Sequence, residues 1–209
     1  TEYQVDGIRF DFTKGFTNTA GDGGGYDLSR INILKRMANR IWQIKENAFV
    51  ILEHFAVNAE EYELSEEGMM LWGNLNHAYN QSTMGYMDGS DFNRISYLER
   101  FWNRPLLVGY MESHDEERLM YKNLSYGNSS GSYQIQDRNT ALARMELAGA
   151  FFFPVPGPRM IWQFGELGYD YSIDYDCRVC NKPIRWDYYK TGLRRRIYQV
   201  WSALIKLKT

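Results

Sequence analysis

Short apolar runs alternate with helical patterns along the whole chain, and this alternation most constrains the fold. The runs have the apolar content of strands and lie at residues 5–12, 48–55, 68–75, 106–115 and 159–166. The second run is almost continuously apolar, as expected for a strand buried on both faces of a parallel sheet. Helical patterns follow at residues 27–42, somewhere in 91–102, 138–152 and 192–207. Such alternation predicts an α/β fold with parallel strands.

Two α/β architectures fit this alternation, an open doubly wound sheet and a (β/α)8 barrel, and the number of strand-helix units helps to decide between them. A complete barrel takes about 250 residues or more and eight strand-helix units. Five units in 209 residues, beginning abruptly on a strand, predict the C-terminal five-eighths of a barrel. The expected fold class is therefore a partial (β/α)8 TIM barrel, with strands four to eight and their helices. We expect no second domain within residues 1–209.

The composition argues against several classes of partner. Lys and Arg number 24 against 26 Asp and Glu, a formal net charge of -2, whereas nucleic-acid-binding proteins carry a basic patch or stripe. No apolar run approaches the roughly 20 residues of a membrane-spanning helix. We therefore expect no nucleic-acid partner and no membrane partner. Cys177 and Cys180 are too few for a disulfide framework, and we expect ordinary loop cysteines, free or locally bonded.

Charged side chains follow three of the apolar runs, at the positions where barrel enzymes hold their reactive groups. These residues are Arg9 and Asp11, Glu53, and His114 with Asp115. Acids that converge on one mouth raise one another's pKa, which costs stability and suits acid/base chemistry. Arg9 lies two residues before Asp11 on an alternating strand, so it points to the same side and can hold Asp11 ionised. One protonated and one ionised acid form the pair that glycoside cleavage requires.

Three segments resemble ordered signature segments of the alpha-amylase family of glycoside hydrolases. They are "DGIRFDFTKG" (residues 6–15), "ILEHF" (51–55) and "MESHDEER" (111–118), which match the fourth, fifth and seventh barrel strands of that family. "PGPRMIWQFGELGYD" (156–170) resembles its eighth-strand segment, and "KPIRWDYY" (182–189) the loop that follows. The resemblance covers essentially the whole chain. It depends on three motifs that occur in the right order, each at a strand end.

The resemblance implies a retaining alpha-glycoside hydrolase that acts on alpha-1,4-linked glucans, namely starch, glycogen or maltooligosaccharides. Asp11 would be the nucleophile that forms a covalent glycosyl-enzyme intermediate. Glu53 would protonate the leaving oxygen and later activate water, and Asp115 would stabilise the distorted, oxocarbenium-like sugar. In a retaining enzyme the nucleophile and acid carboxyl groups lie about 5–5.5 Å apart.

The resemblance also implies substrate-binding roles for three further residues. Arg9 would orient the nucleophile, His114 would donate a hydrogen bond to sugar hydroxyls, and Lys14 would contact the glucan on the leaving-group side. Gly15 departs from the family pattern, because histidine is common there and its carbonyl helps bind a structural calcium in many members. The chemistry requires no cofactor, and a structural calcium is the one ion that the resemblance suggests.

The first three barrel strands of the family have no counterpart in this sequence. We therefore expect this fragment alone to be inactive, and its open sheet edges to favour self-association. Two alternatives stay open: a non-catalytic glucan-binding or structural piece of such a barrel, and a transglycosylase of the same family. The compartment also stays open. A periplasmic or extracellular setting is slightly favoured, because polymer-degrading members of the alpha-amylase family are often exported.

Several other residues are expected to be structural or solvated. His54 should point away from Glu53, because neighbours on a strand face opposite sides. Three aromatic residues in the strand patterns are more typical of a core than of sugar-stacking platforms: Trp72, Tyr110 and Trp162. The acidic run at residues 60–68 is expected to be a solvated helix face. The loop acids Glu166 and Asp170 are also expected to be solvated, with a place in the lining of the cleft as the alternative.

Overall fold

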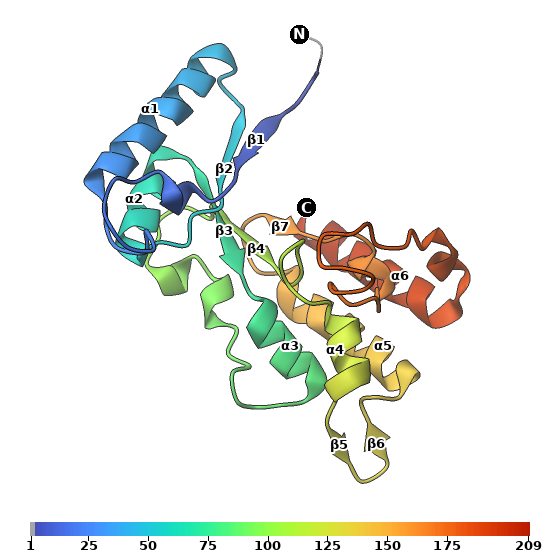
Figure 1. Ribbon diagram of the computed structural model, residues 1–209. Coiled ribbons are helices and arrows are strands. Elements are labelled where there is room, and N and C mark those ends of the chain that lie inside the picture. Colours follow the sequence, from blue (N-terminus) through green and yellow to red (C-terminus); the bar gives the residue numbers. More distant parts are fainter. Residues whose placement is uncertain (1–2) are drawn as a thin grey trace. The chain divides into compact units, whose positions relative to one another are not determined.

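The computed structural model describes residues 3–209, which divide into two compact units. The first unit contains residues 3–73 and 96–108, and the second contains residues 74–95 and 109–209. A five-stranded sheet has the order β1-β2-β3-β4-β7 (Figure 1). Its strands are β1 (Gly7–Phe10), β2 (Phe49–Leu52), β3 (Met70–Asn74), β4 (Leu107–Tyr110) and β7 (Arg159–Met160).

The strands of this sheet are parallel, which confirms the α/β class. β1 pairs in parallel with β2, β2 with β3, and β4 with β7. Two backbone hydrogen bonds that advance in the same direction show that β3 and β4 are parallel too: Leu71 to Leu106 and Leu75 to Tyr110. Phe10 lies opposite Leu52, so the residues that follow β1 and β2 leave the sheet at the same edge. The assignment of these strands to positions four to eight of a barrel stays a prediction.

The first unit packs two helices against its strands (Figure 1). α1 (Leu28–Ile44) lies in the predicted helical segment and begins at an N-cap, where the Asp27 carboxylate accepts hydrogen bonds from the N–H groups of Ser29 and Arg30. α2 (Asn58–Glu67) ends at Gly68, which has a φ of 115°, a backbone conformation that residues other than glycine rarely adopt. The buried apolar residues of this unit include Ile31 and Leu34 of α1, Leu64 of α2, Val50 and Leu52 of β2, and Leu71 of β3.

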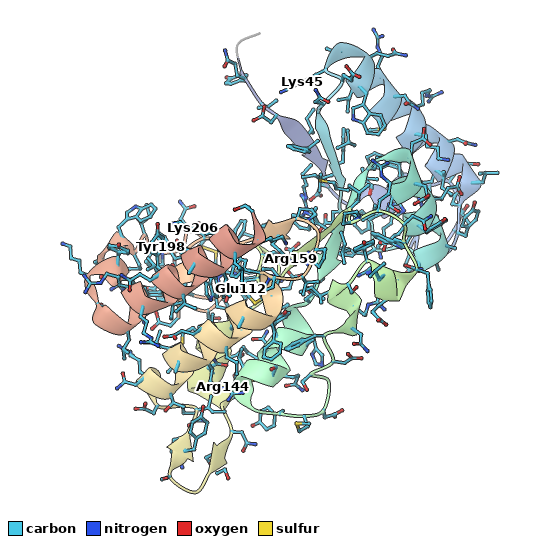
Figure 2. The ribbon with its side chains drawn as sticks, turned by 180° about the vertical axis from the view of Figure 1, so that it is seen from behind. Lys45, Glu112, Arg144, Arg159, Tyr198 and Lys206 are labelled. Carbon is cyan, nitrogen blue, oxygen red and sulfur yellow. A yellow bond between two sulfur atoms is a disulfide. The ribbon has the colours of Figure 1, made fainter. Side chains whose placement is uncertain are left out.

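The second unit is mainly helical. Its helices are α3 (Asn76–Met84), α4 (Leu119–Tyr126), α5 (Arg138–Phe152) and α6 (Gly192–Lys208), and a hairpin of β5 (Ser129–Ser130) and β6 (Tyr133–Gln134) lies between α4 and α5. The predicted helices at 138–152 and 192–207 are confirmed. Trp201 of α6 packs against Phe153 and donates its indole N–H to the carbonyl of Met145 in α5. Arg144 of α5 donates to the carbonyls of Ser82 and Thr83 near the end of α3 (Figure 2).

The prediction of a helix within residues 91–102 is wrong. This segment forms two short 3-10 turns, Asn93–Ile95 and Leu98–Arg100. The side chain of Asp91 accepts a hydrogen bond from the Asn93 N–H, and that of Ser96 accepts one from the Leu98 N–H. Such local bonds from side chains to the backbone compete with helix formation, which favours short turns over a helix in this segment.

The acidic run at residues 60–68 lies on a helix as expected, but the prediction that its face is solvated is wrong at two positions. Glu60 is 0% exposed and Glu61 is 3% exposed. Glu60 binds the guanidinium of Arg30 through two hydrogen bonds of 2.6 and 2.7 Å. Glu61 accepts a hydrogen bond of 3.0 Å from Arg100. Burial is possible because each carboxylate has a paired cation from outside the helix.

Two further expectations concern the loops and the membrane. Cys177 and Cys180 form a disulfide with each other, which is one of the two states expected for them. None of the helices within residues 3–209 combines the length and the hydropathy needed to cross a bilayer.

Candidate active site at the strand ends

Arg9 joins the first two predicted catalytic acids. Its Nη1 lies 2.6 Å from Asp11 Oδ1, and its Nη2 lies 2.7 Å from Glu53 Oε2. Asp11 follows β1 directly and Glu53 follows β2 directly, and the level register of these strands brings both acids to one edge of the sheet. The alternation of β1 predicts the first contact, because Arg9 and Asp11 are two residues apart. The second contact joins residues on different strands.

The two carboxylates have different surroundings. The Asp11 side chain is 73% exposed, whereas that of Glu53 is 11% exposed. Glu53 Oε2 also accepts a hydrogen bond of 2.9 Å from the backbone N–H of Phe12. Paired acids with different environments are the usual means by which one site provides both a nucleophile and a proton donor. The geometry therefore allows Asp11 to meet a substrate from solvent while Glu53 stays fixed.

Trp72 of β3 contacts the charged group of Arg9. The guanidinium carbon lies 4.1 Å from the centroid of the indole ring, within the range of a cation–π contact. Trp72 is 7% exposed, so it is buried as expected, and its ring also fixes the side chain that binds both acids. Tyr110, the second aromatic residue expected in the core, is likewise buried.

Strained backbone follows both strand ends. Phe12, one residue after Asp11, has φ 45°, and Phe55, two residues after Glu53, has φ 54°. Left-handed conformations of this kind cost non-glycine residues about 1–2 kcal/mol and persist where surrounding contacts enforce them. One such contact is Thr13, whose backbone N–H and hydroxyl both donate to the carbonyl of Glu53, at 2.8 and 3.0 Å. The turn after β1 is thereby attached to the end of β2.

A buried network lies behind this turn. His54 is 0% exposed and its ring binds groups other than the Glu53 carboxylate, so the expectation of a structural histidine is confirmed. Its Nδ1 lies 2.9 Å from the Thr13 hydroxyl and its Nε2 lies 2.9 Å from Glu60 Oε1. Burial lowers the pKa of His54, despite the opposing effect of Glu60. His54 therefore links the strand-end turn to α2.

Lys14 is held through its backbone. Its carbonyl accepts a hydrogen bond of 2.6 Å from Arg30, which also donates to the carbonyls of Gly23 and Gly25 in the glycine-rich loop. Its side chain is 20% exposed, and its ammonium group lies 4.0 Å from Asp22. The predicted contact of Lys14 with a glucan stays a prediction.

His114 and Asp115 lie on a loop of the second unit that follows β4. His114 Nε2 is 3.3 Å from Asp115 Oδ2, and the two side chains are 41% and 56% exposed. The Ser113 hydroxyl accepts a hydrogen bond from the Asp115 N–H at 3.0 Å, and the Ser113 carbonyl accepts one from Arg118 at 2.6 Å. Ser113 thus shapes the loop that presents both residues to solvent.

Glu112 begins the same loop and was not identified from the sequence. It is 4% exposed and lies inside the second unit (Figure 2). Its Oε1 accepts a hydrogen bond of 2.7 Å from the Leu119 N–H at the start of α4, which closes the loop that carries His114. Burial raises the pKa of the Glu112 carboxyl from its usual value of 4.5 to about 7. An acid inside an otherwise apolar run is the sequence signal that could have identified it.

The raised pKa of Glu112 predicts that the free energy of unfolding depends on pH. Because its pKa is higher in the folded chain, stability falls as the pH rises from about 4.5 to about 7, by about 3 kcal/mol in total. Glu112→Gln keeps an acceptor for Leu119 without the charge, so its stability relative to the parent should increase over this pH range. Urea unfolding between pH 4 and 8 measures the difference. Glu99→Gln, at an exposed position, is the control, and its stability relative to the parent should not change with pH. If the stability of Glu112→Gln relative to the parent is also the same at every pH, the prediction is contradicted.

The loop acids after β7 differ from expectation. Asp170 was expected to be solvated, but its side chain is 12% exposed and accepts hydrogen bonds from Arg194, at 2.7 Å, and from the Tyr188 hydroxyl. Glu166 is half-buried, and burial raises its pKa. Trp162, expected in the core, is half-buried, with its ring centroid 5.8 Å from that of His114. Burial and hydrogen bonds therefore fix these loop residues, although the composition of the loops indicates solvated side chains.

The structure brings Arg9, Asp11 and Glu53 together in the first unit, and His114 with Asp115 in the second. Within residues 3–209 there is no group of three or more His, Cys, Asp or Glu side chains that could hold a metal ion. The side chains present thus do not form an acidic calcium centre. The expectation of a structural calcium stays a prediction.

Comparison with known proteins identifies a fold. No protein-family model matches the sequence, and no curated protein matches it. Among solved structures, the chain is similar to a pullulanase from Bacillus acidopullulyticus, with a TM-score of 0.65 and 17% sequence identity. The match covers 98% of this chain and 26% of the pullulanase chain, so the chain spans about a quarter of that protein. The chain therefore shares the fold of part of this pullulanase.

Proposed function

We propose that this chain forms part of a retaining alpha-glycoside hydrolase that cleaves alpha-1,4-linked glucans. The observation that carries the proposal is the Arg9 guanidinium bound to both Asp11 and Glu53 at the ends of neighbouring parallel strands. The fold shared with part of a pullulanase supports it. Because the chain spans about a quarter of that neighbour, the activity is proposed for the complete protein.

In the proposed mechanism, Asp11 attacks the anomeric carbon of the substrate while Glu53 protonates the leaving oxygen. Arg9 orients Asp11 through a hydrogen bond, and the N–H of Phe12 helps to fix Glu53. Glu53 then removes a proton from water, which releases the sugar from Asp11 with its configuration retained. Asp115 stabilises the oxocarbenium-like sugar. This role is assigned from its motif, residues 111–118, which resembles the seventh-strand segment of the alpha-amylase family.

Two other functions remain as alternatives. The same residues serve a transglycosylase if a sugar hydroxyl replaces water in the second step. A protein that binds glucans without cleaving them is the non-catalytic alternative. The pair formed by a mostly buried Glu53 and an exposed Asp11 favours catalysis, because a binding site alone does not require two acids on one arginine.

The stereochemistry of the first product tests the proposal. The complete protein is incubated with maltoheptaose, and with pullulan as a second substrate, and the anomeric protons are followed by NMR. A retaining hydrolase releases the alpha anomer first, and the beta anomer appears only later by mutarotation. Longer oligosaccharides among the products would indicate transglycosylation. Beta anomer as the first product, or binding without cleavage, would contradict the proposal.

A further inference from the structure

A cavity of about 530 Å³ lies where the chain leaves β7 in the second unit. Ligand pockets generally measure about 300–1,000 Å³, so one or two sugar rings fit this space. The indoles of Trp162 and Trp186 form its aromatic walls, and Ile161 and Ile184 extend the apolar surface. None of these side chains has a part in the catalytic steps proposed above.

Trp186 is exposed to an unusual degree for a large aromatic residue. It is 71% exposed, and Ile184 beside it in the cavity wall is 69% exposed. The ring of Phe164, which is buried, meets the Trp186 ring edge to face with 4.8 Å between centroids. Trp186 is therefore supported from one side while much of its surface stays open. Apolar residues grouped in one cavity in this way indicate a binding surface rather than incidental exposure.

Two polar side chains share the cavity wall with these aromatic residues. Gln163 has an amide that can both donate and accept hydrogen bonds, and the half-buried Glu166 has a carboxyl group. A pyranose ring has an apolar face that packs on an indole and a rim of hydroxyls that need such partners. The combination of a flat aromatic surface and a few polar groups matches that ligand better than a peptide segment, which would require paired backbone groups.

The cavity adjoins the predicted sugar site of the second unit. Trp162 lines the cavity, and its ring centroid lies 5.8 Å from the ring of His114. His114 is the residue expected to bind sugar hydroxyls. A glucan chain that contacts His114 would therefore have a neighbouring sugar ring within reach of the cavity.

We propose that this cavity is a glucose-binding subsite, in which one ring of an alpha-glucan chain stacks on Trp186 and its hydroxyls bind Gln163 and Glu166. The inference rests on the proposed function for the identity of the sugar. It adds a binding subsite that includes Trp186 to the groups at the strand ends. The subsite contributes affinity for the chain and takes no part in bond cleavage.

The binding of maltoheptaose to the 209-residue chain, measured by isothermal titration calorimetry, tests the inference. Trp186→Ala should weaken binding about tenfold or more, as the loss of an aromatic contact commonly does at interfaces. Trp186→Phe keeps an aromatic face and should weaken it less. Tyr126→Ala removes an aromatic side chain that is 52% exposed on α4 and outside the cavity, and it should leave the affinity unchanged.

The outcomes separate this inference from the proposed function. If Trp186→Ala binds maltoheptaose as tightly as the parent chain, the subsite is wrong, even if the complete protein cleaves glucans with retention. If the parent chain shows no binding at millimolar maltoheptaose, the subsite is also wrong. If binding depends on Trp186 but the complete protein cleaves no glucan, the subsite stands and the proposed hydrolase fails.

Discussion

Replacement of Glu53 by glutamine is expected to lower kcat for maltoheptaose by about 10²–10⁴-fold, the usual contribution of a general acid and base. The glutamine side chain keeps an acceptor for the Phe12 N–H and nearly the same volume, so the strand end should keep its shape. It cannot donate the proton that the leaving oxygen needs. Steady-state kinetics on the complete protein, with Tm as a check on folding, measure the effect.

The choice of substrate makes this prediction specific to the proton transfer. Fluoride leaves without protonation, so alpha-maltosyl fluoride should form the glycosyl-enzyme in Glu53→Gln with a much smaller loss than maltoheptaose suffers. Glu46→Gln, at an exposed position of the first unit, is the matched control and should keep the parent rate. An equal loss on both substrates would show that Glu53 has a structural part and does not act as the acid.

Replacement of Glu60 by alanine is expected to destabilise the fold by about 3–5 kcal/mol, because it leaves a buried arginine without its counter-ion. The side chains of Arg30 and Glu60 are 1% and 0% exposed. Glu60 also binds His54 and the N–H of Asp27. Its loss should therefore loosen α1, α2 and the turn after β1 together. Urea unfolding at pH 7 measures the change.

A second acid on α2 provides the control for this prediction. Glu63 pairs with Lys35 at 2.8 Å, but its side chain is 34% exposed, so Glu63→Ala should cost no more than about 1 kcal/mol. Equal losses for Glu60→Ala and Glu63→Ala would contradict the part assigned to the buried pair. The dependence of stability on pH gives a second check. Burial alone would raise the pKa of Glu60, but hydrogen bonds from Arg30, Asp27 and His54 lower it. The stability that Glu60 contributes to the fold is thus present above pH 4.5 and is lost as the pH falls through the lowered pKa.

The secondary structure followed from the sequence where local signals agree with the packing. α5 has a capping Asp137 and a sequence rich in helix-forming residues, and it occurs at the residues expected. α3 was not predicted, because its sequence "NHAYNQSTM" is rich in Asn, Ser and Thr, which favour turns. It is stabilised by residues far along the chain: Tyr79 is 0% exposed, its ring meets that of Phe152, and its hydroxyl donates to the carbonyl of Phe151.

The site shows the same division between local and distant information. The contact between Arg9 and Asp11 follows from the period of a strand, and it was predicted. The contact between Arg9 and Glu53 depends on the register of two strands, and that between Arg30 and Glu60 depends on how a loop and two helices pack. Distant pairings of this kind leave no periodic signal in one sequence. Glu112 does interrupt an apolar run in the sequence, but its burial against the start of α4 and the loop after β7 depends on such distant packing.

Covalent trapping at Asp11 tests the central claim most directly. The complete protein is treated with 5-fluoro-alpha-D-glucosyl fluoride, from which fluoride leaves as the anomeric carbon bonds to the nucleophile, and the digested protein is sequenced by mass spectrometry. The account predicts a glucosyl label on the peptide that contains Asp11, and its absence from Asp11→Asn. A label on another carboxylate, or turnover of maltoheptaose by Asp11→Asn at the parent rate, would show that Asp11 is not the nucleophile.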